Sequence, residues 1–176
     1  MLNFKNILSI TKKEINSFLN NPASYIVVIV FTLLWEFLFF KQVFLVGQAS
    51  LRGLYDYFPW LMLILVPAIT MGSIAKEKDE GTLELLLTHP VRETELILGK
   101  FLGSLLFVLI PLLFALPLAY SMSIYGRFDW GVFSGQFLGS VLFAASLISL
   151  GVFISGLLSG QIAALLVTAF LGFFLI

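Results

Sequence analysis

The charged residues of this chain gather in one short segment, where they could form ion pairs with another protein. Residues 76–80 read Lys-Glu-Lys-Asp-Glu, in a chain with only 11% charged residues. Two apolar runs of membrane length flank this segment, so its charges must lie in water. Asp79 and Glu80 precede a leucine-rich run. Acidic residues are favourable at the N-terminal end of a helix, which carries a partial positive charge, so these two residues suit the start of a helix.

The leucines that follow predict a face that needs a partner. Leu83, Leu86 and Leu87 recur at three- and four-residue spacing, which places them on one side of a helix. His89 and Pro90 then end the helix. A plain solvated loop is the alternative interpretation, but such a loop has no need for so many leucines. The pattern favours a short amphipathic docking helix.

Glu36 is the ionisable side chain expected deepest in the membrane. It lies about midway along an apolar run, where a carboxyl is costly and indicates a functional site by default. It would line a path, pair across a subunit interface or stay protonated. The alternative is that Glu36 sits near the membrane surface, with Lys41 as a partner about one turn away. The sequence leaves both interpretations open.

Catalytic chemistry finds little support in these residues. Gly99-Lys100 is followed by Phe101, and Thr94 stands where a phosphate-binding loop needs its first glycine. We therefore expect Lys100 to extend to the cytoplasmic membrane surface, and we expect any ATP to be bound by a partner. One histidine makes no two-histidine metal site, so we predict no enzyme activity, cofactor or metal in this chain.

Composition places these residues in a membrane protein. Sixty per cent of the side chains are apolar, far more than a soluble domain of 176 residues can bury. The formal net charge of zero argues against nucleic-acid binding. Residues 1–21 alternate apolar and charged positions with helical spacing, which predicts an amphipathic helix in the membrane interface. A solvated helix on the protein's own surface is the alternative.

The remaining residues, 22–176, predict an all-α polytopic membrane helix bundle with at least five transmembrane spans. The fifth is short and ends without a polar flank, so we expect a truncated chain and six spans in the full-length protein. The distribution of lysine and arginine residues favours a cytoplasmic N-terminus. In that orientation seven of them lie at the cytoplasmic face of the membrane and three at the opposite face. The expected spans are Ala23–Val46, Phe58–Ala75, Leu96–Tyr120, Val132–Leu158 and Gln161–Ile176.

Glycine pairs four residues apart predict close helix packing. They occur at 99 and 103, at 135 and 139, and at 156 and 160. Packing within one subunit is the simpler interpretation, and a seam between two subunits is the alternative.

The charged segment also resembles a known family. The run Ala75–Val91, with Glu-Lys-Asp-Glu-Gly-Thr-Leu-Glu-Leu-Leu at its centre and Gly99-Lys100 after it, is similar to the signature of ABC-2-type transporter permeases. Residues 58–71 and 128–131 resemble the branch that includes the gliding-motility-associated permease subunit. The resemblance implies a six-span permease that dimerises with itself or a related permease, and a separate ATP-binding subunit that drives it.

The resemblance also assigns roles to residues. The segment 76–95 would be the cytoplasmic coupling segment that docks into the ATP-binding subunit, with lipid around the spans. We therefore expect an exporter subunit in the cell inner membrane. A membrane scaffold that anchors a cytoplasmic protein and an ion-driven secondary transporter are the rivals. The expected coupling residues are Glu77, Lys78, Gly81, Thr82, Glu84, Leu86, Leu87 and Pro90, with Glu36 as an intramembrane polar site.

Overall fold

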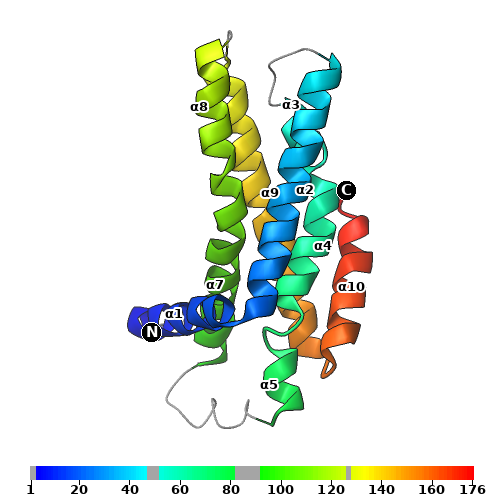
Figure 1. Cartoon of the computed structure of the whole chain (residues 1–176). Helices are drawn as coiled ribbons and strands as arrows, with labels where there is room; N and C mark the ends of the chain where they lie inside the picture. Colours follow the sequence, from blue (N-terminus) through cyan, green and yellow to red (C-terminus); the bar gives the residue numbers. More distant parts are fainter. Residues whose placement is uncertain (1–2, 47–51, 82–91, 126–127) are drawn as a thin grey trace.

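The chain folds into a bundle of apolar helices crossed at one end by an amphipathic helix (Figure 1). The computed structural model describes residues 3–46, 52–81, 92–125 and 128–176, and all regular structure in these ranges is helical. The helices are α1 (Phe4–Asn20), α2 (Pro22–Val46), α3 (Arg52–Asp56), α4 (Phe58–Thr70), α5 (Ala75–Asp79), α7 (Glu93–Leu113), α8 (Ala115–Tyr125), α9 (Trp130–Leu157) and α10 (Gln161–Phe173).

Four stretches in the described ranges are long and apolar enough to cross a membrane: Pro22–Lys41, Phe58–Asp79, Glu93–Ile124 and Trp130–Leu157. A further apolar helix, Gln161–Phe173, is shorter. The prediction of an all-α polytopic membrane bundle is confirmed. The third stretch joins α7 to α8 through a break at Phe114, which lies between Pro111 and Pro117.

Helix α4 occupies the centre of the bundle. The apolar stretch Phe58–Asp79, which includes α4, is 56% buried, whereas the stretch Pro22–Lys41 of α2 is 22% buried. Helix α4 packs on α2, α9 and α10. Fully buried side chains such as Phe58, Met62 and Val66 carry these contacts. Because lipid does not drive apolar helices together, close packing of this kind is what holds them.

The short helix α3 lies between the first two expected spans, Ala23–Val46 and Phe58–Ala75. It returns into the bundle, and Leu54 and Tyr55 are buried. The indole N–H of Trp35 donates to the Leu54 carbonyl, so α2 satisfies a backbone group of this short helix. Burial raises the pKa of the Tyr55 phenol.

Helix α1 lies crosswise at the end of the bundle that also holds α5 and the start of α7 (Figure 1). Asn3 caps it by accepting a hydrogen bond from the Lys5 backbone N–H. Its packing partner is mainly α7.

The glycine pairs have different environments. Gly99 and Gly103 face α1 within the chain, as the simpler interpretation expects, whereas a Cβ at Gly135 or Gly139 would meet no atom within 4 Å. At Gly151, a Cβ would lie 2.2 Å from Thr70 Oγ1, so α4 and α9 touch there because that residue has no side chain.

We expect Gly151→Ala to destabilise the protein, by about 1–3 kcal/mol, because the added methyl overpacks the contact between α9 and Thr70. Gly139→Ala, on the same helix, is the matched control and should be neutral or slightly stabilising. Thermal unfolding of the purified protein in detergent compares them. Equal melting temperatures for the two variants would contradict the close approach.

Candidate functional site

The structure places one predicted coupling residue, Glu77, against a buried lysine. Glu77 and Lys78 lie on α5, and Gly81 ends that helix with a φ of +66°, a conformation that favours glycine. The other predicted coupling residues lie outside the described ranges: Thr82, Glu84, Leu86, Leu87 and Pro90.

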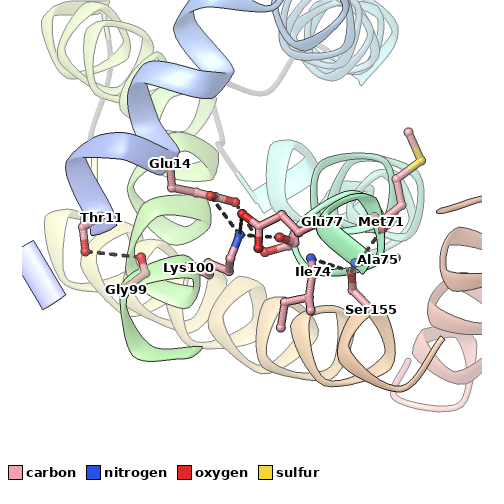
Figure 2. A network of polar contacts seen from close by, with 10 residues as sticks. Thr11, Glu14, Met71, Ile74, Ala75, Glu77, Gly99, Lys100 and Ser155 are labelled. Carbon is pink, nitrogen blue, oxygen red and sulfur yellow. Dashed lines mark hydrogen bonds and ion pairs between the residues drawn. The ribbon is translucent and has the colours of Figure 1, made fainter. Parts of the chain in front are cut away.

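Lys100 on α7 is the centre of this site, and it does not extend to the membrane surface as predicted. Its side chain is only 3% exposed. Its ammonium lies 2.9 Å from Glu77 Oε1 and 3.4 Å from Glu14 Oε2, and it donates to the Ser73 carbonyl. Figure 2 shows the carboxylates of Glu14 and Glu77 converging on it. One cation therefore connects α1, α5 and α7.

Two glycines bring α1 close enough for this contact. A Cβ at Gly99 would lie 2.6 Å from Ile10 Cβ, and one at Gly103 would lie 2.6 Å from Glu14 Cβ. The Thr11 hydroxyl donates to the Gly99 carbonyl at 3.2 Å, as Figure 2 shows. The spacing of the glycines thus fixes the position of Glu14 over Lys100.

Two carboxylates, those of Glu14 and Glu77, lie beside the ammonium of Lys100 and influence each other. Burial raises the pKa of Glu14; the neighbouring Lys100 opposes this rise, and Glu77 adds to it. The Glu14 carboxyl also accepts a hydrogen bond from the Ser73 hydroxyl at 3.4 Å. A buried cluster of charges such as this one is costly to form, and removing one of its members strongly destabilises the protein.

A serine on α9 holds the other side of α5. Ser155 Oγ accepts hydrogen bonds from the backbone N–H groups of Ile74 and Ala75, both at 3.0 Å, and donates to the Met71 carbonyl at 3.1 Å. Figure 2 shows this hydroxyl beside the start of α5. Lys78 also donates to the Gly156 carbonyl. Helix α5 is thereby joined to α9 as well as to α7.

Glu95 attaches the N-terminus of α1 to the start of α7. Its carboxylate accepts the Asn3 backbone N–H at 2.7 Å and the Asn6 side-chain amide at 2.9 Å. Sequence reasoning missed Glu95, Glu14 and Ser155 as site residues. The amphipathic pattern of residues 1–21 showed that Glu14 lies on a helix, but nothing in it indicated a partner 86 residues away.

Glu36 stands apart from this site. It is half-buried on α2, and within the described ranges its carboxylate forms no ion pair with Lys41 or another residue. The structure therefore does not bring Glu36 together with the coupling residues. The parts of the chain that the structure describes also contain no group of three or more His, Asp or Glu side chains arranged to hold a metal ion.

Comparison with known proteins identifies the family. Residues 8–176 match the family described as ABC-2 family transporter protein. The chain belongs to the ABC-2 transporter family. This confirms the resemblance found in the coupling segment, whereas the narrower likeness to the gliding-motility branch stays a prediction.

A curated relative agrees with this family. The chain is 30% identical over 104 residues to the probable ABC transporter permease protein NosY of Pseudomonas aeruginosa. The matched region covers 55% of this ABC-2 protein and 38% of the relative, so the chain matches less than half of the relative's length.

We expect Lys100→Met to destabilise this ABC-2 protein by about 3–5 kcal/mol, because it leaves two buried carboxylates without their cation. Combining it with Glu14→Gln and Glu77→Gln should recover most of the loss. Denaturation in detergent measures both, and Lys12→Met on the exposed face of α1 is the control. A stable single variant, or no recovery in the triple variant, would contradict the shared-cation description.

The raised pKa of Glu14 also predicts a pH dependence. The folded protein holds this proton more tightly than the unfolded chain does, so Glu14 lowers the free energy of unfolding as pH rises from the ordinary value of 4.5 through its raised pKa. Glu14→Gln should remove this part of the decline, and Glu80→Gln, at an exposed position, should keep it. Unfolding measured as a function of pH tests this. Parallel curves for wild type and Glu14→Gln would contradict it.

Proposed function

We propose that this chain is the membrane-spanning permease subunit of an ATP-driven ABC-2 transporter that works as an exporter. The match of residues 8–176 to the ABC-2 family carries the proposal. The relative's printed name, an ABC transporter permease, supports the same role. A separate ATP-binding subunit would hydrolyse ATP, and this chain would bind no cofactor of its own.

The contacts of α5 support a coupling role for residues 76–95. Helix α5 carries the first predicted coupling residues, Glu77 and Lys78, and precedes the others; ion pairs and hydrogen bonds join it to α7 and α9, and Lys100 of α7 is in turn paired with Glu14 of α1. A displacement of the docking residues by the ATP-binding subunit would therefore move a connected group of helices rather than a loose loop. Interactions of this kind carry coupling between sites when they join rigid elements.

The distribution of basic residues supports a cytoplasmic position for this end of the bundle. The helices α1, α5 and α7 begin or lie at the same end (Figure 1), and they carry most of the lysines of the chain. By the positive-inside rule this end faces the cytoplasm of a cell with an inner membrane. A second permease, identical or related, would complete the path, with lipid around both.

We expect Glu84→Lys combined with Leu86→Asp to release the ATP-binding subunit, because it reverses a charge and places a carboxylate in the leucine face. Co-purified ATPase activity should fall about tenfold or more, as for a residue at the centre of an interface. Lys12→Glu, a charge reversal at an exposed position of α1 outside residues 76–95, is the control.

The assay is a pull-down of the tagged full-length protein from mild detergent, with ATPase activity measured in the eluate. Retention of the ATPase by the double variant would show that the docking surface does not lie at Glu84 and Leu86. An eluate from the unmodified protein that never contains an ATPase would contradict the transporter proposal itself and favour the scaffold.

A further inference from the structure

One side of α1 is apolar and is not covered by the rest of the described chain. Phe4, Leu8 and Leu19 are 72%, 61% and 40% exposed. Steps of four and seven residues place these side chains, with the partly exposed Ile15, on one side of the helix. We call these four residues the apolar stripe of α1. Exposed apolar surface of this kind marks a site of contact with a membrane or with another protein.

The contacts between α1 and α7 show which way the apolar stripe faces. Because α1 crosses α7 (Figure 1), the height of a contact along α7 shows which side of α1 makes it. Asn6 contacts Glu95 in the first turn of α7, whereas Phe18 stacks on Phe107, about three turns further into the bundle. Leu8 follows Asn6 by two residues, which is roughly 200° of rotation, so the stripe lies opposite Asn6. It therefore faces the level at which the apolar stretches begin.

Two lysines border the apolar stripe. Lys12 follows Leu8 by four residues and Lys5 by seven, so both lysines lie along the same edge of the stripe. Both are exposed, and within the described ranges neither forms an ion pair. Glu14 is the one acidic residue of α1, and it is turned to Lys100. The free side of α1 therefore presents apolar side chains and positive charge, and it presents no carboxylate.

This combination fits the surface of a membrane that contains anionic lipid. An apolar stripe at the level of the spans can lie among acyl chains, and lysines along its edge can extend their ammonium groups to the phosphates. An acidic protein partner would need only the charges and would leave the stripe at the level of the spans uncovered. The position of the stripe therefore favours lipid.

We propose that the free side of α1 is a binding surface for anionic phospholipids, with Lys5 and Lys12 at the phosphate groups and the acyl chains over the apolar stripe. The proposal requires that the chain spans a membrane, but it does not depend on transport. Both lysines lie outside the segment 76–95 that is proposed to dock the ATP-binding subunit. The two proposals can therefore fail independently of each other.

The test measures which lipids contact α1 in a bilayer. The sequence contains no cysteine, so a fluorescent label can be attached through Ser9→Cys, an exposed position on the same helix. The labelled protein is placed in nanodiscs that contain a brominated lipid, which quenches the label on contact. Brominated phosphatidylglycerol should quench more strongly than brominated phosphatidylcholine at the same mole fraction. Added salt should reduce this difference, because it screens exposed charges.

Lys13 supplies the matched control for the two lysines. It is exposed like Lys12, but it lies about 100° further around the helix and lines a cavity together with Ser17 and Lys76. It therefore points away from the apolar stripe, although it follows Lys12 directly in the sequence.

Lys5→Gln and Lys12→Gln should each raise the mole fraction of phosphatidylglycerol needed for half-maximal quenching about fivefold, the equivalent of roughly 1 kcal/mol for one lysine near an anionic surface. Lys13→Gln should leave this mole fraction unchanged. Equal quenching by the two lipids, or an equal effect of all three variants, would overturn the proposal. If neither lipid quenched the label, the proposal would also be overturned, and a protein partner for the stripe would be favoured.

Discussion

The cytoplasm-facing end proposed for this molecule depends on one buried cation. Lys100 is almost inaccessible to solvent, and such a charge is tolerated only when carboxylates and carbonyls replace its hydration. Glu14 of α1 does so, together with Glu77 and the Ser73 carbonyl, which both belong to the stretch Phe58–Asp79. Satisfying this one side chain therefore fixes where α1, α5 and the start of α7 lie relative to each other. The glycines at 99 and 103 are a consequence of the same constraint, because a Cβ at either would push α1 away.

The rest of the bundle has a different physical basis. Around α4 the contacts are apolar, and small residues such as Gly151 and Gly172 let neighbouring helices approach closely. At the α5 end, polar groups replace this packing, with Ser155 and Glu95 each satisfying backbone N–H groups. A membrane protein of this family thus combines an apolar body with a polar cluster at one end. The body sets the position of the spans, and the cluster joins them to the segment proposed to meet the ATP-binding subunit.

How far these features follow from the sequence differs between the body and the cluster. Apolar length predicts the four long stretches because the bilayer imposes the same requirement on each, and the charged run at 76–80 identifies the segment of interest. Lys100 was assigned wrongly because a lysine near the end of a span usually reaches water. The sequence gives no sign that Glu14 would meet it, since this pairing depends on how α1 crosses α7. The return of Leu54 and Tyr55 into the core is missed for the same reason: it depends on Trp35, a residue of another helix.

The way Ser155 holds the junction of α4 and α5 has a mechanical consequence. Helical hydrogen bonding is interrupted between Thr70 and Ala75, and the donors left at Ile74 and Ala75 are taken by a side chain of α9 instead of by the preceding turn. The stretch Phe58–Asp79 therefore behaves as two levers with a pivot between them. Rotation of the short lever would leave the backbone hydrogen bonds of both helices intact, but it would carry Glu77 along and so pull on Lys100 of α7. A movement of this outer segment would therefore be transmitted to α7 even if α4 keeps its place in the bundle.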